Sequence, residues 1–131
     1  MGVGYIHKCD KCDYSVHTSG PWEFYRDDKG ERKSYGHPVP ISEEAAVRGI
    51  HGLSGDLYCS NCDKVFDIVL VEFEKPVKDS FLVWNGKYNK KESTMKCPEC
   101  NNTNLIFGCE KEIICPRCKK GKLICKIAWI L

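Results

Sequence analysis

Residues 97–118 read CPECNNTNLIFGCEKEIICPRC, with Cys97-Pro98-Glu99-Cys100 at the start and Cys115-Pro116-Arg117-Cys118 at the end. Each C-x-x-C step turns the chain tightly and directs two thiolates at one point. Proline after the first cysteine supports the turn by holding φ at about −65°. Two such steps, 14 residues apart, can complete a tetrahedral metal site. We therefore predict one metal ion bound by Cys97, Cys100, Cys115 and Cys118.

Two further C-x-x-C pairs, Cys9/Cys12 and Cys59/Cys62, are separated by 46 residues. We predict that they form a second four-cysteine site, although the long spacer leaves open that Cys9 and Cys12 serve a different centre. Zn²⁺ is the expected ion at both sites, with iron as the alternative that accepts the same all-sulfur tetrahedron. A disulfide framework is disfavoured because cytosolic thiols stay reduced. Four copies of the motif do not fit a thioredoxin-like redox enzyme.

Two cysteines, Cys109 and Cys125, fall outside these pairs. The simplest expectation is that both are small buried residues, since free cysteine is among the most buried residue types. Cys125 lies in an apolar, strand-like segment, which supports burial. Cys109 lies in a predicted turn and remains a candidate for a substitute metal ligand or a reactive surface thiol.

The C-terminal third, from Met95 to Leu131, resembles the zinc-ribbon family. The resemblance rests on the two proline-containing knuckles and on the strand-like segments 105–107 and 112–114 between them. It implies a three-stranded antiparallel sheet clamped by one Zn²⁺. It implies little about function, because zinc ribbons occur in transcription factors, ribosomal proteins, metal chaperones and enzyme appendages. The N-terminal part looks like a ribbon with a large insertion.

These patterns predict a small, mainly β, metal-stabilised fold with two zinc-ribbon-like units. We expect an N-terminal zinc-binding unit over 1–75, with an insertion over 20–55 that contains one short helix, 43–48, capped by Ser42. A hairpin turning at Asn85-Gly86 and a polar linker at residues 90–94 are expected within 76–94, before the C-terminal zinc ribbon over 95–131. A turn is expected at 19–21.

The composition of the 131 residues, 42% hydrophobic and 29% charged, is that of a globular protein and excludes a fibrous or wholly disordered chain. The most apolar run, 123–131, is interrupted by Lys126. It is far shorter than the roughly 20 residues that a membrane helix needs. No secretory signal is recognisable at the N-terminus, so we expect a cytoplasmic protein without a membrane partner.

Charge is unevenly distributed along the chain. Residues 1–86 carry 10 Lys+Arg and 14 Asp+Glu, whereas residues 87–131 carry 10 Lys+Arg and 4 Asp+Glu. Lys119, Lys120 and Lys122 follow the last knuckle and are the candidate contacts to a nucleic-acid backbone. The simpler interpretation, which we favour, is a solvated face that offsets the thiolate charge of the metal site.

We expect this chain to be an interaction module for a protein partner, with no small-molecule substrate evident. Nucleic-acid binding through the basic C-terminal part is the first alternative. A small enzyme with its site in the 20–55 insertion is the second, and His37, Glu23 and Arg26 are its first candidates. Catalysis is disfavoured because four thiolates close the coordination sphere of zinc, and no common catalytic motif is present.

Overall fold

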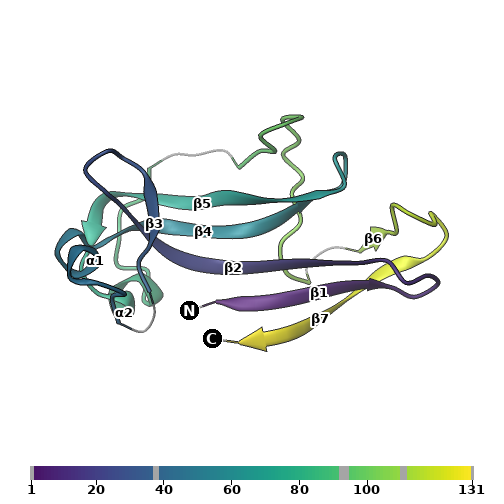
Figure 1. Cartoon of the computed structure of the whole chain (residues 1–131), viewed down its shortest axis with the longest axis horizontal. Helices are drawn as coiled ribbons and strands as arrows, with labels where there is room; N and C mark the ends of the chain where they lie inside the picture. The colour runs from purple at the N-terminus through teal and green to yellow at the C-terminus, as the bar shows by residue number, and fades with distance from the viewer. Residues whose placement is uncertain (1, 37–38, 92–94, 110–111, 131) are drawn as a thin grey trace. The chain divides into compact units, whose positions relative to one another are not determined.

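The computed structural model describes residues 2–36, 39–91, 95–109 and 112–130. These residues form seven strands and two short helices, which confirms the prediction of a mainly β fold (Figure 1). The hydrogen-bonded strand order is β5-β4-β2-β1-β7-β6, with β3 paired to β2. Neither helix in this described part of the chain is long or apolar enough to cross a lipid bilayer.

The chain separates into two compact units, each built from discontinuous segments. The first, here called the helical unit, comprises Pro21–Ser54 and Val69–Ser93. The second, the cysteine unit, comprises Gly2–Gly20, Gly55–Ile68 and Thr94–Leu131. This division differs from the expected consecutive one over 1–75, 76–94 and 95–131. The reason is that three long strands, β2 (Ser15–Arg26), β4 (Ile50–Cys59) and β5 (Lys64–Val77), each contribute residues to both units.

In the helical unit, the end of β2 forms a hairpin with the strand that follows it. The end of β2 pairs antiparallel with β3 (Arg32–Ser34), from Phe24 opposite Ser34 to Arg26 opposite Arg32. The core is a cluster of seven buried residues: Tyr25, Tyr35, Ala45, Ile50, Phe73, Val77 and Val83. The turn expected at 19–21 is absent, because β2 continues through it. Pro21 lies one residue beyond the ladder with β1, so its missing N–H removes no hydrogen bond from that ladder.

The predicted short helix is confirmed as α1 (Glu43–Arg48). Ser42 caps it by accepting a hydrogen bond from the Ala45 N–H at 3.1 Å, and Gly49 ends it with φ at 80°. Glu43 and Glu44 in the first turn and Arg48 in the last match the helix dipole. Ala45, with no exposed surface, anchors α1 in the core.

The hairpin predicted at Asn85-Gly86 is wrong, because this segment forms a second helix, α2 (Ser80–Trp84). The Asp79 carboxylate caps α2 by accepting from the Phe81 N–H at 2.8 Å, and Val83 packs into the core. Gly86, with φ at 70°, ends the helix with a hydrogen bond from its N–H to the Val83 carbonyl at 3.1 Å. A glycine with positive φ is compatible with a helix C-terminus and with a hairpin turn. Here the N-terminal cap supplied by Asp79 favours the helix.

The expected linker begins later than predicted. Lys90 forms an isolated bridge with Phe73 of β5, and the Lys91 N–H donates to the Glu72 carbonyl at 2.8 Å. Residues 90 and 91 therefore extend the sheet of the helical unit, while the rest of the predicted linker, residues 92–94, lies outside the described part of the chain.

In the cysteine unit, β1 (Val3–Cys9) is the central strand (Figure 1). It pairs antiparallel with the first residues of β2, from Val3 opposite Gly20 to Lys8 opposite Ser15. On its other side it pairs with β7 (Lys122–Ile130), and Cys9 lies opposite Leu123. The two-residue strand β6 (Ile113–Ile114) adds to the start of β7. This arrangement brings the first and last knuckles of the sequence to one end of the same sheet.

Candidate metal centres

Cys9, Cys12, Cys115 and Cys118 form one group, here called the terminal cysteine group. Cys9 ends β1, and Cys115 and Cys118 lie in the turn between β6 and β7. The Sγ atoms of Cys9 and Cys118 lie 3.6 Å apart, as do those of Cys12 and Cys115. The β1–β7 ladder holds the two knuckles together, because Asp10 donates its N–H to the Lys122 carbonyl at 3.1 Å.

The other four paired cysteines form the central cysteine group: Cys59, Cys62, Cys97 and Cys100. The Cys59 and Cys100 sulfurs are 3.6 Å apart, and the Cys62 and Cys97 sulfurs are 3.7 Å apart. The two knuckles are aligned by a two-bond bridge between Tyr58 and Ile106, whose N–H groups each donate to the other's carbonyl at 3.0 and 2.9 Å.

All eight predicted cysteines are thus brought into two groups of four, but their predicted pairing is wrong. Cys97 and Cys100 join Cys59 and Cys62 instead of Cys115 and Cys118, which join Cys9 and Cys12. Sequence proximity misled the prediction because loop closure entropy rises only slowly with loop length, so a short spacer is a weak preference. The pairing of the strands determines which knuckles share a group, because β7 lies beside β1 and residue 106 bridges to the end of β4. The C-terminal third therefore does not form a closed ribbon around its own metal.

The geometry of both groups fits a tetrahedral ion. Zinc–sulfur bonds of about 2.3 Å place the sulfurs of a regular tetrahedron about 3.8 Å apart. The four separations of 3.6 to 3.7 Å match this spacing and are far longer than a disulfide bond. In each group all four sulfurs lie within 4.8 Å of one another. Four thiolates around one ion leave no open coordination position, as in structural rather than catalytic zinc sites.

The surroundings favour the thiolate form of one cysteine in each group, Cys59 and Cys118, whereas hydrogen bonds to the neighbouring sulfurs and burial raise the pKa of Cys62 and of Cys12 to about 12. Burial opposes ionisation of Cys59, but hydrogen bonds from the Cys62 backbone N–H and the Asn102 amide lower its pKa to about 6. In the terminal group, the backbone N–H groups of Lys120 and Gly121 lower the pKa of Cys118 to about 6. Thiolates are the form that binds metal, so each group contains a sulfur prepared for coordination.

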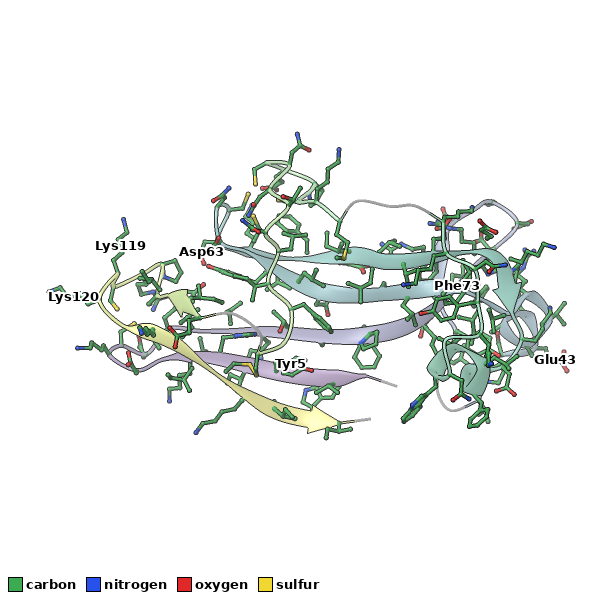
Figure 2. All side chains as sticks on the ribbon, turned by 180° about the vertical axis from the view of Figure 1, so that it is seen from behind. Tyr5, Glu43, Asp63, Phe73, Lys119 and Lys120 are labelled. Atoms are coloured by element: carbon green, nitrogen blue, oxygen red, sulfur yellow. A yellow bond between two sulfur atoms is a disulfide. The ribbon has the colours of Figure 1, made fainter. Side chains whose placement is uncertain are left out.

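A carboxylate shared by two tyrosines connects the two groups within the cysteine unit. Asp63 follows Cys62 with φ at 51°, and its Oδ1 accepts from the Tyr58 hydroxyl at 2.8 Å and also from the Tyr14 hydroxyl. Tyr58 directly precedes Cys59, and Tyr14 lies two residues after Cys12. Burial, with hydrogen bonds to Tyr14 and Asp63, raises the pKa of Tyr58 above its usual range. Figure 2 shows Asp63 at the turn between β4 and β5.

Removing the Tyr14 hydroxyl tests this connection. We expect Tyr14→Phe to lower the free energy of unfolding of the metal-loaded protein by about 1–3 kcal/mol, because a hydrogen bond to a charged carboxylate is lost. Urea unfolding measures the loss. Tyr5→Phe is the matched control, since the Tyr5 ring packs edge-on against Phe107 and its hydroxyl has no hydrogen-bond partner among the described residues. Equal stabilities of the two variants would contradict the role assigned to Asp63.

The two remaining cysteines form a disulfide between Cys109 and Cys125, with Cα atoms 5.3 Å apart. This corrects the expectation that both are buried thiols, and it excludes Cys109 as a substitute ligand in this state. The bond attaches the segment after Ile106 to β7 opposite His7. The sequence offers one indication of this disulfide: two cysteines remain outside the four C-x-x-C pairs, so they can bond to each other.

We expect the double variant Cys109→Ser/Cys125→Ser to be about 3 kcal/mol less stable than the oxidised protein, as for a disulfide closing a loop of this length. Urea unfolding with and without a phosphine reductant is the measurement. In reductant the difference should vanish, while the metal content of both proteins stays the same. A difference that persists after reduction would mean that the serine side chains, not the missing bond, destabilise the fold.

The predicted nucleic-acid contacts lie beside the terminal cysteine group, directly after its last knuckle. Lys119 and Lys120 project from the turn before β7 (Figure 2), and both are exposed. The Lys119 N–H donates to the Cys115 carbonyl at 3.0 Å, which places this lysine on the knuckle itself. Lys122 pairs with Glu112 at 3.3 Å. These positions suit the favoured interpretation, in which lysines offset the charge of the thiolates.

The candidate catalytic residues are not gathered into one site by the described structure. Arg26 donates from Nε to Glu72 at 2.9 Å and so stabilises the sheet of the helical unit. Glu23 is 7% exposed and accepts from the Ser80 hydroxyl at 2.5 Å. His37 lies outside the described residues.

No model of a protein family, no curated protein and no solved structure matches the chain. The site is therefore defined by the geometry of the two cysteine groups alone.

Proposed function

We propose that this chain is a two-zinc protein whose ions are structural, and that it acts as an interaction module for a protein partner. The observation that supports the metal assignment most strongly is the spacing of the sulfur atoms, which suits a tetrahedral ion in both groups. All-thiolate ligation suits zinc and iron alike, and zinc is the ion most often found in four-cysteine structural sites.

Elemental analysis of protein purified without added metal tests the metal assignment. We expect two equivalents of zinc and a colourless protein. Iron at either site would give visible charge-transfer absorption and would overturn the choice of ion. Fewer than two equivalents after reconstitution with excess zinc would overturn the number of sites.

The assignment as an interaction module is supported by apolar surface on β7. Ile124, Ile127 and Ile130 are 47%, 58% and 65% exposed in a strand that also carries the half-exposed Trp129. Exposed apolar residues concentrated on one strand are typical of protein-binding surfaces. Closed thiolate coordination supports the same assignment, because it removes the open metal position that a zinc hydrolase needs.

Substitution of this surface tests the interaction. Partners captured by the wild-type protein should be lost from Ile127→Ser/Ile130→Ser, while the variant retains both zinc ions. Val47→Ser, on the exposed side of α1, is the matched control because Val47 is also strongly exposed. Equal capture by all three proteins would overturn β7 as the interaction surface.

Nucleic-acid binding through Lys119 and Lys120 remains the alternative, supported by their exposure at the terminal knuckle. Its signature is an affinity for single- or double-stranded oligonucleotides that falls steeply with salt. Lys119→Gln/Lys120→Gln would then weaken binding to all sequences equally. No binding at low salt would exclude this alternative.

A further inference from the structure

The sheet of the cysteine unit carries a small cavity over β1 and β7. Its volume is about 240 Å³, and its lining consists of Ile6, Lys8, Cys9, Asp10, Ile124 and Lys126. All six residues belong to the cysteine unit. We propose that this cavity binds an extended acidic segment of the protein partner, which places an apolar side chain between the two lysines. The inference rests on the proposed function, because it names the chemistry of the partner that binds at β7.

The pairing of β1 with β7 brings two lysines and two isoleucines to one face of the sheet. Ile6 lies opposite Lys126, and Lys8 lies opposite Ile124. Opposite residues of an antiparallel pair share a face, as do residues two positions apart along a strand. The lysines therefore occupy one diagonal of a square and the isoleucines the other. Residues on such a diagonal are about 7–8 Å apart.

The two lysines can accept a carboxylate from a partner. Both Lys8 and Lys126 are exposed, and neither forms an ion pair with any residue in the described part of the chain. Cys125, which is bonded to Cys109, lies between Ile124 and Lys126 in β7 and so faces the other side of the sheet. The disulfide therefore attaches its segment on the face opposite to the cavity.

Negative charge in the lining is confined to one end. Asp10 is the one acidic residue there, and its Oδ1 accepts a hydrogen bond from the Lys122 N–H at 2.9 Å. The Cys9 sulfur lies at the same end and accepts from the Lys11 N–H at 3.3 Å. Lys126, opposite residue 6, is four ladder positions from Asp10, or about 13 Å at about 3.3 Å per residue. The end of the cavity at Lys126 therefore favours a carboxylate most strongly.

The isoleucines and the size of the cavity define the rest of the ligand. Ile6 is half-buried and Ile124 is half-exposed, so they form an apolar floor. A volume of about 240 Å³ is below the range of about 300–1,000 Å³ typical of pockets for drug-sized molecules, and it suits one apolar side chain. Every second side chain of an extended segment faces the sheet. The matching pattern is therefore acidic, any, apolar, any, acidic, with the long lysine side chains reaching outward to the carboxylates.

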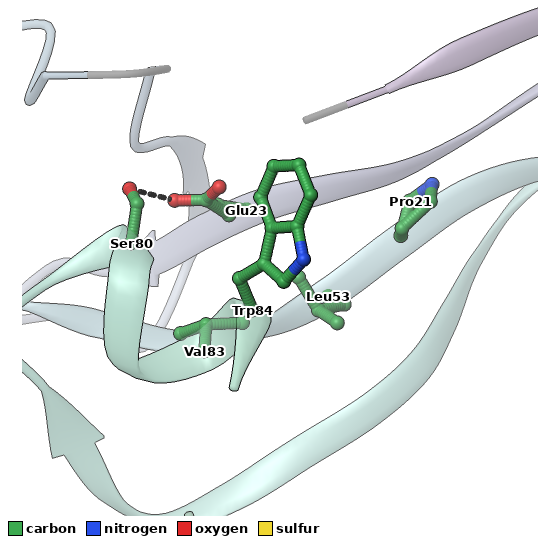
Figure 3. Close-up of a pocket in the computed structure, with 6 residues that line it drawn as sticks. All are labelled: Pro21, Glu23, Leu53, Ser80, Val83 and Trp84. Atoms are coloured by element: carbon green, nitrogen blue, oxygen red, sulfur yellow. Dashed lines mark hydrogen bonds between the residues drawn. The ribbon is translucent and has the colours of Figure 1, made fainter. Parts of the chain in front are cut away.

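A second cavity, in the helical unit, has the opposite charge and provides an internal control. Figure 3 shows its lining, which consists of Pro21, Glu23, Leu53, Ser80, Val83 and Trp84. Its acidic residue, Glu23, accepts a hydrogen bond from the Ser80 hydroxyl at 2.5 Å, and no lysine or arginine lines it. An acidic segment should therefore not bind there.

Titration of the zinc-loaded, ¹⁵N-labelled protein with the N-acetylated, C-amidated peptide TETLTET tests the site. We expect saturable shifts of the lining amides of β1 and β7, with a Kd in the millimolar range, and no shift of the Ser80 and Leu53 amides. The peptides TQTLTQT and TETSTET, which lack the carboxylates and the apolar side chain respectively, should each bind at least fivefold more weakly. Equal binding of TETLTET and TQTLTQT would overturn the acidic partner, and equal binding of TETLTET and TETSTET would overturn the apolar contact.

Two double variants assign the response to the cavity. Lys8→Gln/Lys126→Gln should raise the Kd for TETLTET at least tenfold, because both positive charges are removed from exposed positions. Lys75→Gln/Lys87→Gln changes two exposed lysines of the helical unit and should leave the Kd unchanged. An equal Kd in the two folded variants would overturn the site. Should the first variant fail to fold, the comparison of TETLTET with TQTLTQT on the wild-type protein decides the role of charge.

Nucleic acid is the competing source of negative charge. An eight-nucleotide oligothymidylate that shifts the same amides with a lower Kd than TETLTET would assign the cavity to nucleic acid and overturn the proposal. The capture test with Ile127→Ser/Ile130→Ser changes residues outside the lining and does not depend on the peptide. If capture is lost in that variant but TETLTET does not bind, the acidic chemistry is wrong and the proposed function stands. If TETLTET binds but capture is unaffected, the acidic site stands and the proposed surface is wrong.

Discussion

Replacing Cys97 and Cys115 together by serine is expected to remove both metal ions. In the structure Cys97 belongs to the central cysteine group and Cys115 to the terminal group, so each substitution breaks a different site. If Cys97 and Cys115 instead shared one ion, as their closeness in sequence suggests, the double variant would keep the other ion, bound by Cys9, Cys12, Cys59 and Cys62. Native mass spectrometry of zinc-reconstituted protein measures the number directly.

The matched control keeps the substitution of Cys115 and replaces Cys9 instead of Cys97. Cys9→Ser/Cys115→Ser carries the same number of substitutions but damages only the terminal group, and it should retain one zinc ion. Under consecutive pairing this control would instead lose both ions. The two double variants thus predict opposite results under the two pairings, and a general loss of folding cannot produce the expected contrast.

The single variant Cys115→Ser should also destabilise one part of the molecule selectively. A structural zinc site contributes on the order of 10 kcal/mol to folding, which is comparable with the whole stability of a small protein. The amides of Cys9 and Cys115, which donate to the Tyr14 and Gly121 carbonyls at 2.9 Å, should lose protection from hydrogen exchange. The Tyr58 and Ile106 amides beside the central group should stay protected.

Substituting Gly121 is expected to have the second large effect. A Cβ atom at this position would lie 2.5 Å from the Cys9 sulfur and 2.6 Å from Asp10 Oδ1, closer than any real contact. Relief of the clash requires the Cys9 ligand or the β1–β7 ladder to move. We therefore expect Gly121→Ala to weaken zinc binding at the terminal group at least 100-fold, as measured by competition with a zinc chelator.

Gly30→Ala is the control for this substitution. Gly30 has φ at 80°, but a Cβ there would meet no atom within 4 Å. The variant should lose only about 1–2 kcal/mol of stability from the left-handed conformation and should keep both zinc affinities. Wild-type zinc affinity in Gly121→Ala would contradict the close approach of the last knuckle to Cys9.

The sequence predicted the ligands but not their partners. The spacing within each C-x-x-C step is local, so the identity of the eight cysteines follows from it. The assignment of Cys59 to Cys100 and of Cys9 to Cys118 depends on which strands pair across the sheet, and strand pairing over such distances has no local signature. The helix at 43–48 was predictable because its signals are local: Ser42 and Gly49, which cap its two ends, directly flank it in the sequence.

Other errors arose where one local pattern fits two structures. Asn85-Gly86 fits a type I′ turn and also a helix C-terminus, and the capping by Asp79 that decides between them lies six residues earlier. The disulfide between Cys109 and Cys125 was missed because the cytoplasmic expectation argued against one. Glu23, predicted as a catalytic candidate, lies in a cavity whose other walls come from β4 and α2, and no sequence pattern brings these segments together.

The most direct test of the crossed metal centres is cadmium NMR. In ¹¹³Cd-substituted protein, a ¹H–¹¹³Cd correlation experiment links each bound ion to the β-protons of its own cysteines. We expect two cadmium resonances in the range of four-thiolate sites, one correlated with Cys9, Cys12, Cys115 and Cys118 and the other with Cys59, Cys62, Cys97 and Cys100. A resonance correlated with Cys97, Cys100, Cys115 and Cys118 together would contradict the arrangement described here.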